Sequence, residues 1–515
     1  MNRIAFTKSF FVIAILAAFL GLAACGGGGN AVVIPPPPGN FTNESFINSY
    51  AFSYQGSDSG GVPLAVAGEL VADGSGKITS GILDINDFGN IGTALPILAG
   101  STYNVGADGR SSATLNIQGG TITLQFTLSS NSHALVTEFD SFGSGSGTID
   151  QQDTNVTSTQ LSGNYAFIAS GVDFNFNETT IGGNFATAGA VLTPGQAVWD
   201  AVDAGTFVVT DDNTLSGTTP LDAANAGRGQ LSLTSTQING FTFVFGYYIV
   251  DATHIKLIGI DQTGTFFLAG DAYKAPSAPA QLANSNYAFT VSGEAAALTP
   301  VGIGGVFTSN GSGNITGGVQ DLNNNASGNA HLKQTLQAAA YTVDPTFARI
   351  DLRLNNGNIF EYAAYPTSSG TVILIEIDGK QAVTSGIAYR QTATTAVQGN
   401  YAINLTGLAI KQSLDFVQDV VGQVNVASGG AVTGTIDINN LFQGPPVPNI
   451  SLSSNSKLPA LDSPVTGRGN PFALQSNQLG ANGFALSYYV VDANTVLLVE
   501  MDSVRVTTGI MVKQP

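Results

Sequence analysis

The chain has 515 residues, with 17 Lys and Arg against 35 Asp and Glu, and its formal net charge is −18. Charged residues make up only 10% of the chain, whereas an average soluble protein has about 25%. Apolar residues make up 43%, which is enough to build packed cores and argues against a disordered chain. Nucleic acids are polyanions, so this acidic composition also argues against nucleic-acid binding.

The N-terminus begins with two basic residues, Arg3 and Lys8, followed by an apolar run from Phe10 to Leu22. This run is shorter than the roughly 20 residues of a membrane-spanning helix. It ends in Leu22-Ala23-Ala24-Cys25, and Cys25 is the only cysteine of the chain. The pattern resembles the lipobox of bacterial lipoproteins, in which the signal peptide is cut before the cysteine and that cysteine carries lipid. The alternative is an ordinary secretory signal followed by an incidental cysteine.

The lipobox resemblance implies that residues 1–24 are removed and that Cys25 anchors the protein in the cell envelope. Gly26 follows the cysteine in place of an aspartate, which by the same resemblance implies sorting to the outer membrane. A lipidated Cys25 leaves no thiol for a disulfide, so stability has to come from packing. Residues 25–43 combine the run Gly26–Gly29 with Pro35–Pro38 and predict a flexible, then stiff, tether. An ordered strand at Ala31–Ile34 is the alternative.

The rest of the chain repeats itself four times. An opening Asn/Ser-Tyr-Ala-Phe/Ile motif recurs, and its tyrosines are 115, 122 and 114 residues apart. Four marks in a constant order predict four tandem copies of one domain. The predicted copies are residues 44–156, 157–277, 278–393 and 394–515. The motif tyrosines are Tyr50, Tyr165, Tyr287 and Tyr401.

Three further marks follow each motif tyrosine. The first, 34 to 36 residues on, is an Asp-x-Asn sequence: Asp84, Asn86 and Asp87; Asp321 and Asn323; Asp437 and Asn439; and a worn form at Asp200. The second, 60 to 67 residues on, is an arginine: Arg110, Arg228, Arg349 and Arg468. The third is an aspartate that closes a late apolar strand: Asp140, Asp261, Asp378 and Asp502.

Each copy consists of short strand-like runs separated by glycine-rich turns. Thr121–Leu128, for example, alternates polar and apolar residues without a break, which predicts a strand with one face in a core and one in water. About eight such strands per copy predict an all-β protein of four small antiparallel domains. An up-and-down barrel is the expected fold, with a two-sheet sandwich as the alternative. The runs are too short and too polar to favour an outer-membrane barrel.

The Asp-x-Asn marks have two interpretations. Carboxylate and amide oxygens are the ligands that calcium prefers, so Asp84, Asn86 and Asp87 and their counterparts are candidate calcium ligands. No EF-hand spacing accompanies them, and Asp and Asn also end strands by hydrogen-bonding their own turns. The structural turn is the favoured interpretation, so the sequence predicts no definite cofactor.

The repeated arginines are expected to form structural ion pairs. Each could pair with a carboxylate of the Asp-x-Asn mark, or with the aspartate of the Asp140 position, and so join two strands. An anion or carbohydrate contact is the alternative.

The sequence offers no catalytic motif. Its three histidines do not form a metal or triad pattern, and His133 and His254 occupy a position that threonines fill in the other copies, which predicts exposed strand starts. Paired carboxylates of a glycoside hydrolase remain the less favoured enzymatic alternative, because Glu138, Glu376 and Glu500 each precede their aspartate by two residues.

These marks together resemble the tandem β-domain lipoproteins of bacterial surfaces, a type that implies location and architecture but no activity. The first hypothesis is therefore a non-enzymatic, lipid-anchored envelope protein whose four domains form a stalk or a binding and adhesion array. Its expected partners are the membrane, through Cys25, and glycans or other envelope proteins. The second hypothesis is that each barrel holds a small ligand or carbohydrate inside.

Overall fold

The computed structural model describes residues 40–515 except for 154, 156–160, 205–208, 237–241, 262–265, 296–298, 325–328, 380–381, 412–413, 442–443, 464 and 480–482. Cys25, the signal peptide and the tether up to residue 39 therefore lie outside the described residues. Val33–Pro515 forms one compact unit. Within the described residues, no helix is long and apolar enough to cross a membrane.

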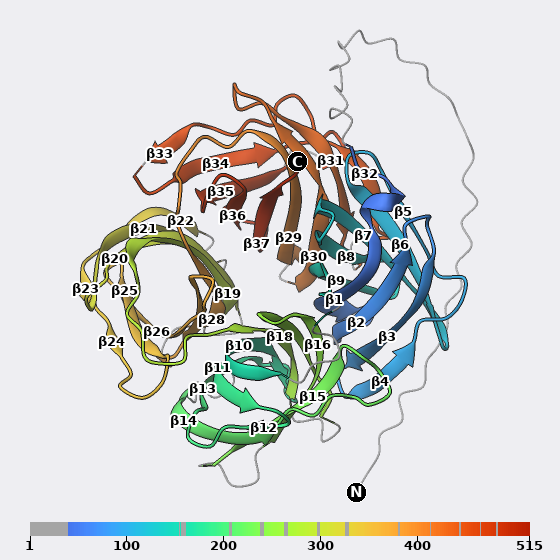
Figure 1. Ribbon diagram of the computed structural model, residues 1–515. Helices are drawn as coiled ribbons and strands as arrows, with labels where there is room; N and C mark the ends of the chain where they lie inside the picture. The colour runs from blue at the N-terminus through green and yellow to red at the C-terminus, as the bar shows by residue number, and fades with distance from the viewer. Residues whose placement is uncertain are drawn as a thin grey trace, which may run out of the picture. The chain divides into compact units, whose positions relative to one another are not determined.

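The chain folds into four antiparallel sheets in succession (Figure 1), preceded by one short helix, η1 (Asn43–Ser45). The first sheet contains β1 (Ile47–Asp58), β2 (Pro63–Asp73), β3 (Ile78–Asp87), β4 (Asn90–Pro96), β5 (Thr102–Val105), β6 (Arg110–Ile117), β7 (Gly120–Ser130), β8 (His133–Phe139) and β9 (Gly143–Gln151). The second contains β10 (Ser162–Asp173), β11 (Glu178–Ala188), β12 (Val191–Leu192), β13 (Val198–Asp203), β14 (Val209–Thr218), β15 (Arg228–Ser235), β16 (Thr242–Asp251), β17 (His254–Gly259) and β18 (Phe266–Lys274).

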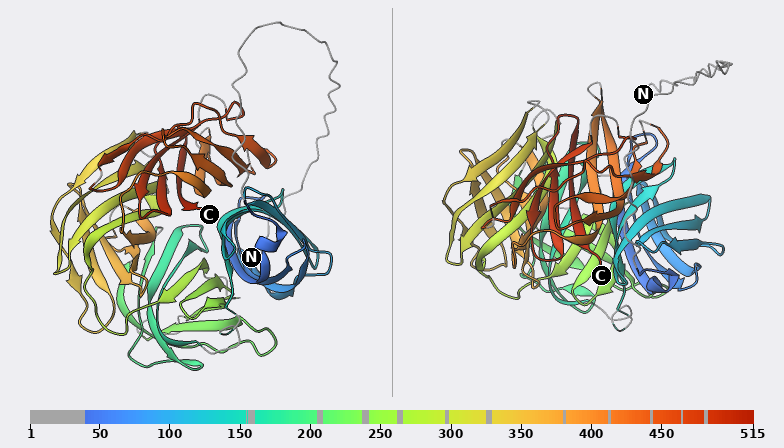
Figure 2. Two further views of the ribbon diagram at one scale, coloured as in Figure 1. Left: turned by 45° about the horizontal axis from the view of Figure 1, so that its top comes forward. Right: turned by 90° about the horizontal axis from the view of Figure 1, so that it is seen from above.

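The third sheet contains β19 (Asn284–Ala295), β20 (Thr299–Asn310), β21 (Asn314–Asn324), β22 (Asn329–Leu336), β23 (Ala339–Ala340), β24 (Thr342–Val343), β25 (Ile350–Asn355), β26 (Ile359–Pro366), β27 (Thr371–Glu376) and β28 (Ala382–Arg390). The fourth contains β29 (Gly399–Lys411), β30 (Leu414–Val426), β31 (Val432–Asn439), β32 (Val447–Ser451), β33 (Leu461–Ser463), β34 (Arg468–Leu474), β35 (Phe484–Val490), β36 (Thr495–Glu500) and β37 (Arg505–Lys513). Figure 2 shows the same four sheets from two other directions.

Each sheet curls into an up-and-down barrel. Most strands pair with their neighbours in the chain, and the first strand of each copy also pairs with the last, as β1 does with β9 and β29 with β37. In the second sheet, pairing of β10 with β11 closes the ladder completely. In the other three, isolated bridges join the sheet ends: Lys77 to Thr102, Gln337 to Asn355 and Ala431 to Lys457. The prediction of four all-β, up-and-down domains is confirmed, and we call them barrels 1 to 4.

Side chains fill the barrel interiors. The alternation along β1 turns Tyr50, Phe52 and Tyr54 inward, where they join one apolar cluster with residues of the other strands of barrel 1. Barrels 2, 3 and 4 have equivalent clusters of about twenty buried apolar residues each. The hypothesis of a ligand inside each barrel is therefore wrong for the described residues, because aromatic and aliphatic side chains occupy the space.

The repeated Tyr-Ala-Phe sequence also explains how the barrels meet. Tyrosine and phenylalanine face the interior, and the alanine between them faces the neighbouring barrel. Ala51 packs with residues of barrel 2, Ala166 with barrel 3, Ala288 with barrel 4, and Ala402 with Leu135 of barrel 1. All four alanines are fully buried. A small side chain at this position lets adjacent barrels approach closely.

Candidate functional site

A buried arginine joins each barrel to the one before it. Arg228 of barrel 2 pairs with Asp84 of barrel 1 at 3.0 Å, and Arg349 of barrel 3 pairs with Asp200 of barrel 2 at 2.7 Å. The same pairing occurs between Arg468 of barrel 4 and Asp321 of barrel 3, at 2.7 Å. We call each such pair an Arg–Asp clamp.

The fourth clamp joins barrel 1 to barrel 4. Arg110 Nη2 lies 2.8 Å from Oδ1 and 2.9 Å from Oδ2 of Asp437. The contact connects the two ends of the series, so the four barrels close on one another rather than forming a linear stalk.

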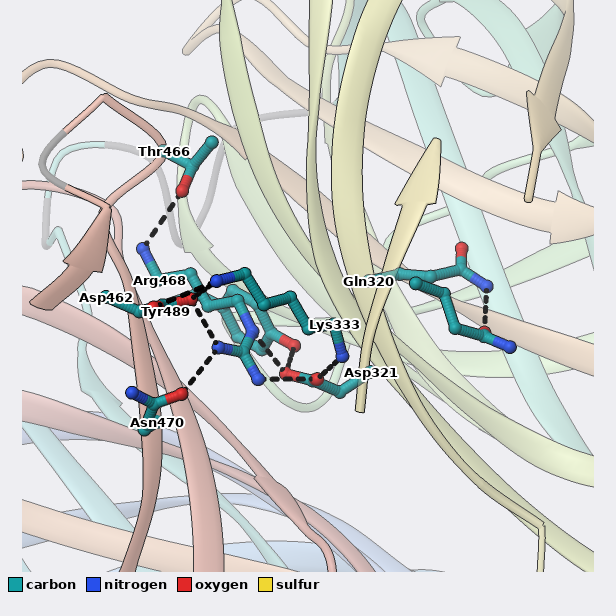
Figure 3. A network of polar contacts seen from close by, with 9 residues as sticks. Gln320, Asp321, Lys333, Asp462, Thr466, Arg468, Asn470 and Tyr489 are labelled. Carbon is teal, nitrogen blue, oxygen red and sulfur yellow. Dashed lines mark hydrogen bonds and ion pairs between the residues drawn. The ribbon is translucent and has the colours of Figure 1, made fainter. Parts of the chain in front are cut away.

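The clamp around Arg468 shows the geometry most clearly (Figure 3). The guanidinium donates from Nε to Asp321 Oδ2 at 2.9 Å and from Nη2 to Oδ1 at 2.7 Å, which is a bidentate pair. Tyr489 donates its hydroxyl to the same carboxylate, and the backbone amide of Lys333 donates to it at 2.6 Å. Arg468 and Asp321 are 1% and 0% exposed. Desolvation alone would lower the pKa of Arg468, but the hydrogen bond and charge of Asp321 outweigh it and raise that pKa.

The asparagine of each Asp-x-Asn mark makes a second contact across the same interface. Asn86 donates to the carbonyl of Gly259 in barrel 2, and Asn323 donates to the carbonyl of Glu500 in barrel 4. Asn439 donates to the carbonyl of Glu138 in barrel 1. Barrel 2 has a valine at this position, and there Asn184 donates to the carbonyl of Ala348 in barrel 3 instead. The Asp-x-Asn marks and the repeated arginines therefore carry polar contacts between barrels.

This geometry revises the expectations for the marks. The arginines pair with the Asp-x-Asn carboxylates, but the partner comes from the preceding barrel and not from a strand of the same one. The same guanidinium contacts occupy Asp84, Asp321 and Asp437, so the structure gives no support to calcium at these positions. Within the described residues, no group of three His, Cys, Asp or Glu side chains is placed to hold a metal.

The aspartates of the Asp140 position do not form the Arg–Asp clamps. Asp140 accepts from the backbone amides of Phe142 and Gly143 and so caps its own turn, while Asp502 pairs with Arg505 at 2.7 Å. Asp87, the last residue of the first mark, is half-buried beside Asp58, and burial first and that charge second raise its pKa. Asp261 and Asp378 also make interactions.

The glutamates Glu138, Glu376 and Glu500 are at most 3% exposed. A carboxyl pair of a glycoside hydrolase has to reach a bound sugar, and these side chains are closed off from solvent.

The two strand-start histidines contribute to a polar cluster between barrels 1 and 2. Lys256 is fully buried and lies 2.8 Å from Asp150 and 4.0 Å from Asp271. His133 contacts Asp150 at 2.6 Å, and His254 contacts Asp271 at 2.8 Å. The two histidines begin β8 and β17, as expected for strand starts. They are partly buried and in contact with aspartates, so the expectation that they are exposed is wrong.

A cavity of about 750 Å³ lies where the four barrels meet. Its lining comes from all four barrels, chiefly from their first strands β1, β10, β19 and β29. Gly60, which is exposed, and Phe176, which is 50% exposed, belong to the lining, so the cavity opens to solvent at the hairpins. We call it the central cavity, and its volume falls within the roughly 300–1,000 Å³ that is common for small-molecule sites.

At one level of the central cavity, the same repeat position contributes a residue from each barrel. This position lies seven residues after the motif tyrosine and pairs with the second strand of its barrel. The four facing pairs are Ser57 with Pro63, Val172 with Glu178, Glu294 with Pro300, and Leu408 with Val417. All eight residues line the cavity.

Two carboxyl groups therefore line a cavity whose other described side chains are uncharged. Glu178 comes from barrel 2 and Glu294 from barrel 3, and both are half-buried. Burial first, and the nearby charge of Glu294 second, raise the pKa of Glu178 well above its ordinary value. Ser57 is 5% exposed, and its hydroxyl makes no hydrogen bond within the described residues. The cavity lining contains no Lys or Arg among the described residues.

Comparison with known proteins adds no assignment. No protein-family model and no curated protein matches the chain. Among solved structures, a mutant of transferrin binding protein B from Haemophilus parasuis matches 76% of this chain and 86% of its own, at 11% identity and a TM-score of 0.20. Transferrin binding protein B from Neisseria meningitidis matches 74% of this chain and 83% of its own, at 8% identity and a TM-score of 0.19. At such TM-scores the similarity carries no argument about function.

Sequence reasoning missed Glu178, Glu294, Ser57 and Lys256. A signal for three of them was present: Ser57 and Glu294 both lie seven residues after a motif tyrosine, where the other copies have Val172 and Leu408. Acidic or polar residues at one repeat position of only some copies indicate a role that the common fold does not require. Glu178 then follows, because strand pairing places it opposite Val172.

Proposed function

We propose that this protein is a lipid-anchored, non-catalytic protein of the cell envelope that binds a small molecule in the central cavity. The observation that carries the proposal is the cavity itself, which has the volume of a ligand site and is open to solvent. Its walls come from four barrels that buried clamps hold together. A site of this kind is already formed before the ligand arrives, so binding costs little ordering of the protein.

The lipid anchor rests on the resemblance of Leu22-Ala23-Ala24-Cys25 to a lipobox. Replacing Cys25 with serine removes the acceptor thiol, so the variant is expected to leave the membrane fraction. Two or three acyl chains anchor a protein stably, whereas none leaves only the protein's own surface to hold it. The measurement is fractionation of bacterial cells that express either form, followed by immunoblotting and mass spectrometry of the N-terminal peptide. A Cys25→Ser variant that stays in the membrane fraction would contradict the anchor.

Binding in the central cavity can be tested by filling it. Leu408→Trp adds an indole to the lining, next to Val417. A ligand at 100 times its Kd stabilises the protein by about 2.7 kcal/mol, so it is expected to raise the melting temperature of the wild type but not of Leu408→Trp. The screen uses envelope metabolites and soluble glycan fragments, and thermal melting is the measurement.

The matched control is Ile359→Trp, since Ile359 is 52% exposed and lies outside the cavity lining. Ligands that stabilise both variants equally bind somewhere else. If every stabilising ligand behaves in that way, the central cavity is not the binding site.

A further inference from the structure

The lining of the central cavity includes acidic and polar side chains that the barrel fold does not require. The repeat places a side chain at the same level from each barrel, and barrels 2 and 3 supply Glu178 and Glu294 there. The first strands of barrels 2 and 4 have Val172 and Leu408 at the position of Glu294 and fold in the same way. The acidic residues are therefore not needed to form a barrel, and bringing two carboxyls together in a half-buried site costs stability.

A third oxygen belongs to the same cavity lining. Ser57 is more than nine-tenths buried, belongs to the cavity lining, and its hydroxyl makes no hydrogen bond within the described residues. It projects from the same repeat position as Glu294, in barrel 1. A buried hydroxyl without a partner costs free energy unless a ligand or water satisfies it.

The rest of the lining is apolar and partly aromatic. Phe176 is half-exposed at the opening and stacks on Phe88 with 4.2 Å between ring centroids, and Phe416 and Phe267 also face the cavity. Aromatic faces attract cations. A cavity of about 750 Å³ is far larger than a bare metal ion, and two carboxylates are fewer oxygen ligands than calcium takes. The lining therefore fits an organic cation better than a metal.

We infer that the central cavity binds a primary organic ammonium ion, with the nitrogen between Glu178 and Glu294. Three N–H donors then meet three acceptors, the two carboxylates and the Ser57 hydroxyl. The apolar body of the ligand lies against the aromatic wall. This inference rests on the proposed function, because it names the class of ligand that the cavity takes.

The test is isothermal titration calorimetry of the mature chain with Cys25→Ser, which retains every described residue. The probe is phenethylammonium, and its uncharged analogue is phenethyl alcohol. Phenethylammonium is expected to bind in a 1:1 ratio and at least tenfold more tightly than the alcohol. The double variant Glu178→Gln/Glu294→Gln is expected to bind the ammonium at least tenfold more weakly than the wild type does and the alcohol unchanged.

Two further readouts separate ligand binding from folding. Glu361→Gln is the matched control. Glu361 lies on β26, pairs with Arg353 of β25 and is outside the cavity lining, so this variant is expected to bind like the wild type. The double glutamine variant is expected to melt at or above the wild-type temperature at pH 7, because it removes two crowded carboxyls. Ammonium binding is also expected to release protons and to strengthen as the pH rises, since it keeps Glu178 ionised.

The outcomes distinguish this inference from the proposed function. Equal affinity for phenethylammonium and phenethyl alcohol, with Leu408→Trp blocking both, overturns the ammonium inference and leaves a neutral-ligand cavity. Calcium binding that is lost in the double variant, with no ammonium binding, overturns it in favour of a metal site. If neither probe binds and the screen gives no ligand that depends on the cavity, both proposals fail.

Discussion

Replacing Asp321 with alanine is expected to lower the free energy of unfolding by about 3–5 kcal/mol, the usual cost of leaving one buried charge without its partner. Arg468 is 1% exposed, and Asp321 accepts both its Nε and its Nη2 hydrogen bonds. The variant also removes the acceptor for the Tyr489 hydroxyl. Urea unfolding of the wild type and variant measures the difference.

The matched control for this prediction is Asp462→Ala. Asp462 also contacts Arg468, at 3.0 Å, but it is 16% exposed and its other partner, Lys333, is 61% exposed. The control is expected to cost less than Asp321→Ala, because Arg468 keeps its bidentate pair with Asp321. The triple variant Asp321→Leu/Arg468→Met/Tyr489→Phe replaces the whole clamp with apolar groups and is expected to recover most of the loss. A loss of stability as large in Asp462→Ala as in Asp321→Ala would contradict the prediction that the Arg468–Asp321 pair contributes most of the stability.

The stability of the protein is expected to fall as the pH rises from about 5 to 8. Burial raises the pKa of Glu138 and of Glu376 from 4.5 to about 8. Each carboxyl therefore keeps its proton in the folded state over a range in which the unfolded chain has released it. Between these two pKa values, each group lowers the free energy of unfolding by roughly 1.4 kcal/mol per pH unit. The stabilisation is complete below about pH 4.5 and is lost as the pH rises through 8.

The variant Glu138→Gln/Glu376→Gln tests this dependence, because an amide cannot ionise. The variant is expected to be more stable than the wild type at pH 8, to show no such gain at pH 4.5, and to have a flatter pH profile. Glu361→Gln serves again as the control, since Glu361 is only partly buried and pairs with the exposed Arg353. Parallel profiles for the wild type and the double variant would mean that neither carboxyl carries the pH dependence.

The fold could be predicted from the sequence because its signals are local and repeated. Tyr50 and Phe52 alternate with Ala51, and the same alternation recurs in all four copies, which indicates strands with one inward face. Hairpins join strands that are close in sequence, so the up-and-down order follows from the spacing of the turns. The spacing of the four marks gave the number of copies.

The contacts between barrels could not be predicted in the same way. Arg228 and Asp84 are 144 residues apart, and Arg110 and Asp437 are 327 apart. In a chain of equal copies, an arginine at a given repeat position is equally compatible with its own carboxylate and with that of a neighbour. Only the packed structure decides between them. The cavity residues could not be found from the repeated marks. Those marks are the residues that the copies share, whereas Glu178 and Glu294 are residues at which the copies differ.

The Arg110 clamp differs from two of the others. Opposite Arg228 and Arg468 the neighbouring strand has Tyr248 and Tyr489, but opposite Arg110 it has Thr127. Arg110 uses only Nη2 toward Asp437, and its buried Nε has no partner within the described residues. This clamp therefore differs from those of Arg228 and Arg468, whose Nε atoms donate to the aspartate carboxylate.

The contact between barrels 4 and 1 also bears on what happens when the chain is cut short. Barrel 1 presents the arginine side of a clamp, and the last barrel presents the aspartate side. The arginine side of one molecule complements the aspartate side of another. A chain that ends after barrel 3 leaves both faces open, with Asp321 at one end and Arg110 at the other. Head-to-tail association through such faces gives rings when the rotation closes and filaments when it does not. With the fourth barrel present, Arg110 instead pairs with Asp437 of its own chain.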